Sequence, residues 1–472
     1  MDDPPLPSPG GGRKPGLSAL IRRIALEILM EAEGSGKFVD EVLAARIGDL
    51  EEKDRRLLQE MVFGAVRHMN TLDHLLNFHL KFPMVHQVLP VRWALRLGTY
   101  QLVYLGRIPA HAALHQTLEA LKALAGVGLR EVGFANAVLR KISSEVRLKS
   151  EEPPLDRDDP ACLPIRLGHC HFQRPVMPLI RLGAAAHLAI KYSHPRWLIE
   201  RWLDRYGEEE TRRLCEVNNI TPRLIVRVRR LAPSREEILT KLREEGWKAT
   251  PGNLDDSIIL ERGGDLKVSE TFSKGWLQAQ DETSIRIGGV LHPPPGARVL
   301  DLCSAPGGKA AQLLEAIGSD GHLLAADRSD EKLALVTENL SRIGTNFTTM
   351  VVPEDPARLD LGQSFSHILV DAPCSNTGVL ARRPEARWRI RPRDLESLSA
   401  LQKSLLEAAL RHLEPGGRLL YATCSIEPEE NEEVIARVFQ GYDDLVERET
   451  HLFLPHRTPG DGGFCSLLVR ER

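Results

Sequence analysis

Short apolar runs alternate with longer amphipathic segments from residue 281 to the end of the chain. Strands that alternate with helices form a parallel sheet covered on both faces, because each crossover carries the chain back across one face of the sheet. Residues 281–472 are therefore expected to form a doubly wound, Rossmann-like α/β domain. The predicted strands are 298–302, 322–327, 347–352, 366–371 and 418–422, and the predicted helices are 309–317, 329–342, 394–413 and 430–440.

The residues before this domain divide into four segments. Residues 1–16 are rich in Pro and Gly and are expected to be a disordered tail. Residues 17–147 contain six stretches with apolar side chains at helical spacing, which predicts an all-α domain. Residues 148–190 hold many prolines and little periodicity, so we expect a linker. Residues 191–280 mix helical and strand patterns, which predicts a small α+β module that connects the two larger domains.

The composition excludes several classes of protein. Lys and Arg total 62 and Asp and Glu total 65, so the net charge is −3. This balance argues against a basic nucleic-acid coat but leaves room for a local basic groove. No apolar run reaches the roughly 18 residues of a membrane span, and the first residues lack the apolar core of a secretory signal. We therefore expect a cytoplasmic protein with no membrane partner.

The cysteines fit a reducing compartment. The chain has seven of them and no Cys-x-x-Cys pair, which is a poor basis for a disulfide scaffold. Cys162, His169, Cys170 and His171 lie close together in the expected linker, and a zinc site is the alternative to plain linker residues. Their spacing matches no common zinc pattern, so we expect no metal.

A loop of small residues follows the first predicted strand of the α/β domain and leads into a helix. Glycines let a ligand approach the backbone, and the helix N-terminus lies beside it, as in nucleotide-binding sites. Asp327 follows Gly308 by 19 residues, at the end of the second strand, where a carboxylate can accept hydrogen bonds from ribose hydroxyls. The loop consists of Cys303, Ser304, Ala305, Pro306, Gly307, Gly308 and Lys309.

The loop lacks the residues that bind phosphate groups. A Walker loop needs Ser or Thr after Gly-Lys, where this chain has Ala310, and its first Gly stands where this chain has Cys303. The dinucleotide fingerprint Gly-x-Gly-x-x-Gly is also absent. An adenosine ligand without phosphates fits better, so we expect S-adenosylmethionine.

Two cysteines follow two of the predicted strands. Cys374 comes shortly after Asp371 at the end of the fourth strand, and Cys424 follows the fifth. The carboxyl ends of parallel strands open on one ligand crevice, so both thiols are expected there. The alternative is that both are small buried hydrophobic residues. The zinc deaminase pattern also begins Pro-Cys, but Thr377 replaces its second cysteine.

Two thiols and a carboxylate suit methylation of a pyrimidine at carbon 5. Methyltransferases that attack exocyclic nitrogen atoms carry an aromatic residue where this chain has Cys374, which favours carbon as the target. Carbon 5 is a poor nucleophile until a thiolate adds to carbon 6, and a base must later remove the carbon 5 proton. Because a free cysteine is only a few per cent ionised at neutral pH, the attacking thiol needs a lowered pKa.

Arginines cluster directly after Cys374. Six of them fall between Arg382 and Arg393, with an aromatic residue among them. Cations that bind phosphate, next to an aromatic that can stack on a base, are typical of an RNA-binding loop. Arginines also line one face of the predicted strand 223–230, and a solvated charged surface is the alternative in both places. The candidate RNA-binding residues are Arg382, Arg383, Arg387, Trp388, Arg227 and Arg229.

Three segments of the α/β domain resemble the RNA 5-methylcytosine methyltransferases of the NOL/NOP/Sun class. The helical front of the chain resembles a NusB-like domain, and the module before the α/β domain resembles that family's connecting module. The likeness covers roughly residues 17–145 and 191–472. Its segments are DLCSAPGGK, VDAPCSNTGVLARRPEARWR and LLYATCSIEPEENE, then GTYQLVYLGRIPAHAALHQTLEALKAL and GFANAVLRKI, and finally YSHPRWLIERWLDRYG, VNNITPRLIVRVRR and WLQAQDETS.

The resemblance implies an activity and a partner. It implies methylation of carbon 5 of a cytosine in 16S ribosomal RNA, with S-adenosylmethionine as donor and an RNA-binding front domain. The partner is then 16S rRNA or a small-subunit assembly intermediate. Two alternatives stay open, namely the same chemistry on transfer RNA or another RNA, and an RNA-binding assembly factor with a degenerate enzyme domain.

The resemblance also implies roles for single residues. Cys424 is implied to be the nucleophile, and Cys374 to act in product release. Asp371 is implied to hydrogen-bond the cytosine ring and the methyl donor, which the loop, Asp327 and Asp355 also hold. The family usually shows Gly-Asp at the third strand, where this chain has Glu before Asp355.

Overall fold

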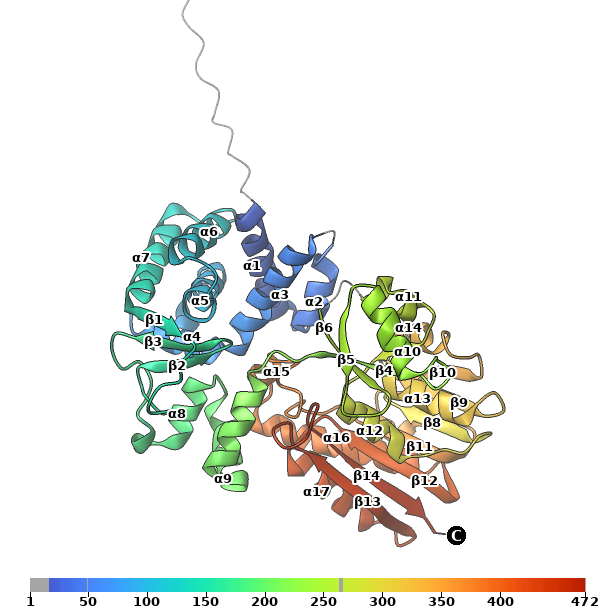
Figure 1. Ribbon diagram of the computed structural model, residues 1–472. Coiled ribbons are helices and arrows are strands. Elements are labelled where there is room, and N and C mark those ends of the chain that lie inside the picture. The colour runs from blue at the N-terminus through green and yellow to red at the C-terminus, as the bar shows by residue number, and fades with distance from the viewer. Residues whose placement is uncertain (1–16, 49, 263–265, 472) are drawn as a thin grey trace, which may run out of the picture. The chain divides into compact units, whose positions relative to one another are not determined.

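The computed structural model describes residues 17–471 except residues 49 and 263–265, so the tail expected at 1–16 lies outside the described residues. The chain divides into two compact units, and the boundary follows Arg205 (Figure 1). None of the described helices combines the length and the hydropathy that crossing a membrane requires.

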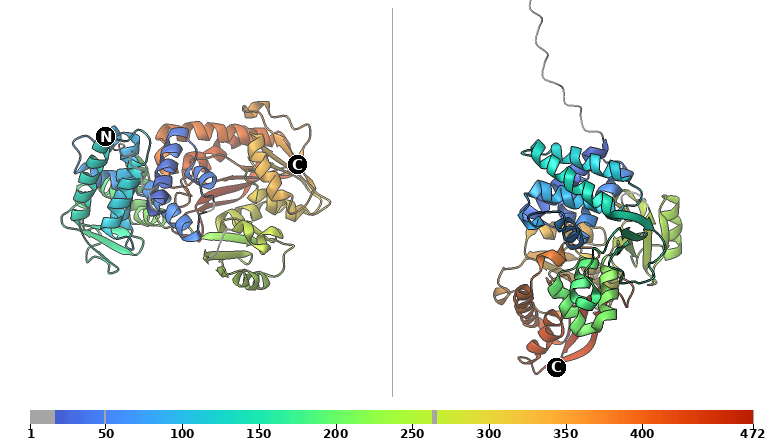
Figure 2. Two further views of the ribbon diagram at one scale, coloured as in Figure 1. Left: turned by 90° about the horizontal axis from the view of Figure 1, so that it is seen from above. Right: turned by 90° about the vertical axis from the view of Figure 1, so that its left-hand side faces the viewer.

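The described part of the first unit begins with seven α-helices, which Figure 2 shows side by side in blue to teal. This bundle confirms the predicted all-α front. At its centre α5 contacts α1, α3, α4, α6 and α7, because apolar residues occur all round its surface. The sequence pattern misses α2, which buries only Val39, Val42 and Leu43. The helices are α1 (Leu17–Ser35), α2 (Val39–Arg46), α3 (Glu52–Arg67), α4 (Met69–Asn77), α5 (Leu89–Tyr104), α6 (Ala110–Lys122) and α7 (Leu129–Glu145).

A three-stranded antiparallel sheet occupies part of the segment predicted to be a linker, so the linker prediction at 148–190 is wrong for these residues. The strand order is β1-β3-β2. Pro164 lies in β2, an edge strand, where a missing N–H breaks no central ladder bond. The prolines that suggest a linker therefore lie where a small sheet tolerates them. The elements are β1 (Val146–Ser150), β2 (Cys162–Ile165), β3 (Gly168–Phe172), α8 (Ala184–Lys191) and α9 (Arg196–Asn218).

The cysteines of this sheet are core residues. Burial raises the pKa of Cys162 to about 11 and that of Cys170 to about 12. Zinc is bound by thiolates, which these pKa values disfavour. Within the described ranges, no group of three or more His, Cys, Asp and Glu residues is arranged to hold a metal ion. The two thiols therefore pack as small hydrophobic side chains.

A four-stranded antiparallel sheet forms the small module of the second unit, in the order β5-β6-β4-β7. Val226 and Val228 of β4 share a core with Ile238 and Leu242 of α10. This arrangement agrees with the α+β module that the sequence predicts. The elements are β4 (Leu224–Val228), α10 (Arg235–Glu244), β5 (Lys248–Pro251), β6 (Ser257–Arg262), α11 (Glu270–Ser273) and β7 (Leu277–Ala279).

A seven-stranded sheet forms the core of the second unit, in the order β10-β9-β8-β11-β12-β14-β13 (Figure 1). Its first five strands are parallel and match the five predicted strands. The last two are antiparallel additions at one edge, so the sheet is mixed rather than purely parallel. The strands are β8 (Arg298–Leu302), β9 (His322–Asp327), β10 (Phe347–Val351), β11 (Phe365–Asp371), β12 (Leu413–Thr423), β13 (Leu445–Phe453) and β14 (Gly463–Arg470).

Helices cover both faces of this sheet. Neighbouring residues of β8 point to opposite faces, because side chains alternate along a strand. Leu300 belongs to the same core cluster as Leu406 of α16, and Val299 to the same cluster as Leu314 of α13. The predicted doubly wound architecture is confirmed. The helices are α12 (Glu282–Val290), α13 (Gly308–Ile317), α14 (Asp330–Leu340), α15 (Ala386–Arg389), α16 (Pro392–Leu410) and α17 (Glu432–Phe439).

Candidate active site

The two strand-end cysteines lie in contact. β11 and β12 are neighbours, and Asp371 stands opposite Ala422 in their register. The loops that follow the two strands therefore begin side by side. The backbone N–H of Cys424 donates to Cys374 Sγ at 3.3 Å, and the Cys424 carbonyl accepts from Gly378 N at 2.9 Å. The structure thus brings together the two thiols that the sequence placed at separate strand ends.

The two thiols differ in acidity. A hydrogen bond from Cys374 lowers the pKa of Cys424, although burial acts in the opposite direction, and the ammonium of Lys309 lowers it further. The same hydrogen bond and burial raise the pKa of Cys374 well above its usual value. Of the two thiols, Cys424 is therefore the one whose surroundings favour the thiolate form.

A lysine and an aspartate complete the surroundings of Cys424. Lys309, from the first turn of α13, places Nζ 2.6 Å from Asp371 Oδ2. Burial lowers the pKa of Lys309, but the charges of Asp371 and Cys424 outweigh burial and hold it above its ordinary value. Lys309 is therefore a cation that faces both the Asp371 carboxylate and the Cys424 sulfur.

The loop after β8 is fixed by backbone hydrogen bonds and by Asp327. Ser304 N donates to Ala326 O at 3.0 Å, and Ala305 N donates to Asp327 Oδ2 at 3.1 Å. Gly307 has a φ of +100°, and a Cβ there would lie 3.3 Å from the Val336 backbone, so only glycine suits this position. The loop and the end of β9 thus form one rigid edge of the sheet.

Asp301 is a member of this edge that sequence reasoning missed. Its side chain is buried, and its Oδ2 accepts a hydrogen bond from Ser304 Oγ at 2.8 Å. Burial raises the pKa of Asp301 to about 7. Oδ1 of Asp301 has no hydrogen-bond partner in the structure as described. Its position two residues before Cys303 is the signal that could have identified it.

Asp355 has local contacts. Its carboxylate accepts from Ala357 N at 3.0 Å and lies 3.4 Å from the Arg358 guanidinium, and its side chain is 55% exposed. The residue follows β10, as the sequence indicates, and the residues it contacts belong to its own turn. A role for Asp355 in holding the donor remains a prediction.

Two of the predicted RNA-binding arginines hold the fold together instead. Arg382 Nη2 lies 2.7 Å from Asp281 Oδ2, and its Nε bonds to Asp461. Arg387 is fully buried, and its guanidinium donates to Asn219 Oδ1 at 3.0 Å and to backbone carbonyls. These protein partners assign both guanidinium groups to the fold, which argues against the prediction that the two residues bind RNA.

Arg383 and Trp388, in the same arginine-rich segment, are less buried than Arg387. Arg383 and Trp388 are half-buried. Both side chains therefore keep some exposure to solvent, unlike that of Arg387. Contact with RNA at these two positions remains a prediction.

The arginines of β4 are also structural. Arg227 makes a two-pronged ion pair with Glu315 of α13, at 3.0 and 2.8 Å, and both side chains are 5% exposed. Arg229 is buried as well, and its Nη2 donates to Gln278 Oε1 at 2.7 Å. Neither residue is solvated or presented to RNA, so the structure contradicts both of the alternatives drawn from the sequence.

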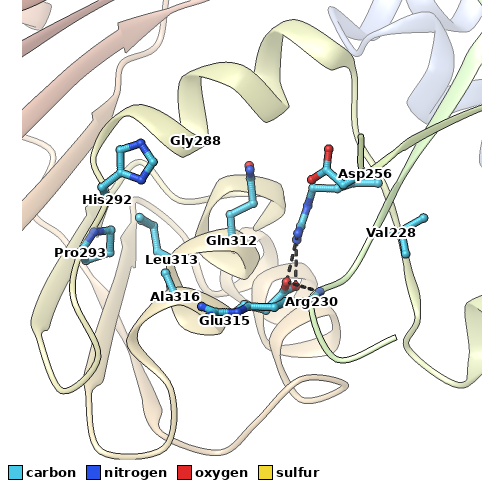
Figure 3. Close-up of a pocket in the computed structure, with 12 residues that line it drawn as sticks. Val228, Arg230, Asp256, Gly288, His292, Pro293, Gln312, Leu313, Glu315 and Ala316 are labelled. Carbon is cyan, nitrogen blue, oxygen red and sulfur yellow. Dashed lines mark hydrogen bonds and ion pairs between the residues drawn. The ribbon is translucent and has the colours of Figure 1, made fainter. Parts of the chain in front are cut away.

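A pocket of about 350 Å³ lies beside this ion pair (Figure 3). Glu315 and Gln312 of α13 form one wall, and Arg230 and Asp256 of the small module form another. Gln312 is engaged within the protein, since it donates to Ile285 O at 3.0 Å. None of the lining residues belongs to the cysteine site, so the pocket is separate from the predicted chemistry.

Comparison with known proteins identifies three regions of the chain. Residues 289–467 match the family model of the 16S rRNA methyltransferase RsmB/F, residues 20–144 match the NusB family, and residues 194–267 match the RsmF/B-like ferredoxin-like domain. The chain is 32% identical to ribosomal RNA small subunit methyltransferase B of Salmonella dublin over 462 residues, which cover 96% of this chain and 99% of that protein. The protein of the same name from Escherichia fergusonii is 33% identical with the same coverage.

The chain belongs to the RsmB/F family of 16S rRNA methyltransferases. Solved structures show the same fold. PH0851 superposes with a TM-score of 0.76 at 24% identity and covers 98% of this chain and 99% of its own. A methyltransferase homolog from Pyrococcus horikoshii has a TM-score of 0.54 at 25% identity, and covers 61% of this chain and 99% of its own.

The sequence analysis of this RsmB/F family member also missed a buried carboxylate. It lies beside the loops that carry Cys374 and Cys424. Glu430 is fully buried and binds the serines that follow both cysteines. The signal available in the sequence is the run of acidic residues shortly after Cys424. Such a run normally indicates a solvated surface, and only the tertiary structure shows that one of its members lies inside.

Proposed function

We propose that this protein methylates carbon 5 of a cytosine in 16S rRNA, with S-adenosylmethionine as donor and Cys424 as nucleophile. The observation that carries the proposal is the contact between the two strand-end cysteines beside the ion pair of Lys309 with Asp371. The acidity of the cysteines, all seven of which lie in the described part of the chain, supports it. The pKa of Cys424 is lowered, whereas the pKa values of the other six are raised. A lowered thiol pKa marks a reactive cysteine, whereas a raised one marks an inert core residue.

The contacts of Cys424 support a defined sequence of events. Its thiolate adds to carbon 6 of the cytosine, and the displaced electron pair makes carbon 5 nucleophilic. S-adenosylmethionine, when bound, supplies the electrophilic methyl group. Asp371, held by Lys309, hydrogen-bonds the pyrimidine ring in this proposal.

Cys374 suits the release step. Once the Cys424 sulfur is bonded to carbon it carries no negative charge, so one cause of the raised Cys374 pKa disappears. The Cys374 thiol can then release its proton to solvent, and the resulting thiolate takes the proton from carbon 5. The bond between carbon 6 and the Cys424 sulfur breaks, and its electron pair returns to that sulfur as the thiolate.

The loop edge suits the methyl donor. Asp301 Oδ1 is a buried acceptor without a protein partner, and it can accept a hydrogen bond from the donor's amino group. Asp327 lies at the end of β9, next to the glycine-rich turn, where ribose hydroxyls bind in such folds. A structural neighbour, NSun6 from Pyrococcus horikoshii, is described with SFG, a donor analogue. These residues, with Asp355 and Asp371, are the proposed donor site.

The proposal is tested with two cysteine variants. Tritium transfer from labelled donor to 16S rRNA is measured for wild type, Cys424→Ala and Cys374→Ala, with transfer RNA and a small-subunit particle as comparison substrates. Cys424→Ala should lose both methyl transfer and covalent RNA adducts, because the attacking sulfur is gone. Cys374→Ala should accumulate an adduct that survives denaturation, because release stalls.

Three outcomes would count against the proposal. An adduct that forms in Cys424→Ala but not in Cys374→Ala would exchange the two roles. A wild-type protein that binds no donor in calorimetry would favour an assembly factor without activity. Methylation that appears in transfer RNA but not in 16S rRNA or the particle would change the substrate.

A further inference from the structure

One buried carboxylate binds residues from both cysteine loops. Glu430 is 0% exposed, and its Oε1 accepts from Ser375 N at 2.8 Å and from Gln402 Nε2 at 3.1 Å. Its Oε2 accepts from the hydroxyls of Ser375 and Ser425. Ser375 directly follows Cys374, and Ser425 directly follows Cys424. Each cysteine is thus one residue away from the same carboxylate.

We infer that Glu430 is a positioning residue for the reaction: it joins the loop after β11 to the loop after β12 and so keeps Cys374 in contact with Cys424. The inference rests on the proposed function of the two cysteines. The proposed chemistry needs two sulfurs in contact. The two strands pair as far as Asp371 and Ala422, and the hydrogen bond from Gly378 N to Cys424 O joins the loops beyond them, but these contacts act on the backbone. The side chains beyond those residues need a further restraint, and a misplacement of about 1 Å can cost 10²-fold in rate.

Glu430 is itself held firmly. The carbonyl of Glu430 accepts from the Tyr421 hydroxyl of β12 at 2.6 Å. The next residue, Asn431, accepts from Thr423 Oγ1 at 2.6 Å and donates to Ser425 O at 3.0 Å. The turn that carries the carboxylate is therefore tied to the strand that carries Cys424. A buried carboxylate whose acceptor positions are all engaged holds the groups that bind it in fixed positions.

The charge of Glu430 adds a second effect. The hydrogen bond with Cys424 and burial are the larger causes of the raised Cys374 pKa, and the negative charge of Glu430 raises it further. The charged groups that face Cys424 come from other elements: Lys309 from α13, Asp371 from β11 and Asp461 from the loop before β14. Glu430 therefore acts on Cys374 more than on Cys424, and it favours the arrangement in which Cys374 keeps the proton.

Two variants separate the joint from the charge. Glu430→Gln keeps the shape, because its amide oxygen can accept from Ser375 N while its amide group donates to the serine hydroxyls, which rotate to accept. It removes only the charge. Glu430→Ala removes both the joint and the charge. Glu433→Gln is the matched control, since Glu433 is an exposed acid on the adjoining helix α17.

The first measurement reports where the proton resides. Wild type, Glu430→Gln and Glu433→Gln are treated briefly with limiting iodoacetamide between pH 6 and pH 9, and alkylation of each cysteine is read by peptide mass spectrometry. Wild type and the control should label Cys424 in excess of Cys374, because thiolates react faster. Glu430→Gln should shift the ratio towards Cys374 by about threefold to tenfold, which corresponds to a relative pKa change of roughly 0.5 to 1.

The second measurement reports positioning. Glu430→Ala should lower kcat for methylation by about 10- to 100-fold and leave the KM for RNA within about twofold, because the substrate surface is unchanged. A folded Glu430→Ala with wild-type kcat would overturn the inference. If Glu430→Ala does not fold, Ser425→Ala takes its place, because it removes one of the serine hydroxyls that bind the carboxylate, and a wild-type kcat in that variant would overturn the inference. An unchanged alkylation ratio in Glu430→Gln would overturn the second effect, that of the charge. Failure of the proposed function is distinct, since it appears as absent methylation by the wild type.

Discussion

The buried ion pair between β4 and α13 allows a quantitative test of the corrected role of Arg227. The perturbation is Glu315→Gln, which removes the charge of the only carboxylate that Arg227 contacts in the described structure. Arg229 Nε also lies 3.7 Å from Glu315 Oε1, and burial lowers the pKa of Arg229 to about 10. The substitution therefore leaves two buried guanidinium groups without their ion-pair partner, and Asp256 is the remaining carboxylate that interacts with the charge of Arg227.

The magnitude follows from burial. Breaking a buried pair by neutralising one partner costs about 3–5 kcal/mol, because the other charge stays desolvated. Arg227→Met should lower the free energy of unfolding by less, about 1–3 kcal/mol. Glu315 still accepts a hydrogen bond from Arg230 N at 3.1 Å, and the charge of Arg229 still lies nearby. The double variant should be less destabilised than the sum of the two by at least about 1.5 kcal/mol.

The assay is urea unfolding of the full chain, with RNA binding measured in parallel. With a slope of about 3 kcal/mol per M, Glu315→Gln should lower the unfolding midpoint by about 1–1.7 M. Arg227→Met should leave the dependence of log affinity on log salt unchanged, because Arg227 contacts no phosphate in this interpretation. A midpoint lowered by less than about 0.3 M, or a salt slope reduced by about 1 in Arg227→Met, would refute the reasoning.

Three further perturbations address the site and its surroundings. Lys309→Met should raise the pKa of Cys424, so the alkylation rate of Cys424 should reach half its maximum at higher pH, and an unmoved profile would contradict the role of the ammonium. Arg382→Met should lower the unfolding midpoint through loss of its Asp281 and Asp461 partners, yet keep the salt slope of RNA affinity, and a smaller slope would restore a phosphate contact. Because the pKa of Asp301 is raised from 3.8 to about 7, its burial disfavours folding increasingly as pH rises through that range, by up to about 4 kcal/mol. Asp301→Asn should remove this loss of folding stability. Between pH 5 and pH 8, the free energy of unfolding of the variant should therefore fall less than that of the wild type.

Errors in the sequence-based prediction have identifiable physical origins. The linker predicted at 148–190 holds strands of four or five residues, which are too short to show a reliable alternation. β13 is an edge strand with four consecutive exposed residues, so it also lacks the alternation of a half-buried strand. α2 buries too few side chains to produce a helical stripe.

The local pattern of the chain was sufficient for the helical front, the five parallel strands and the positions of Cys374 and Cys424 at strand ends. Those features depend on the spacing of apolar residues and on short motifs, both of which are properties of neighbouring residues. Tertiary structure alone decided the partners of the polar side chains. An arginine on a strand is compatible with water, with phosphate or with a buried carboxylate, and Arg227 meets its carboxylate 88 residues further along the chain. Likewise, 50 residues separate Ser375 from Ser425, and only folding brings both to Glu430, because long-range contacts leave no local signature.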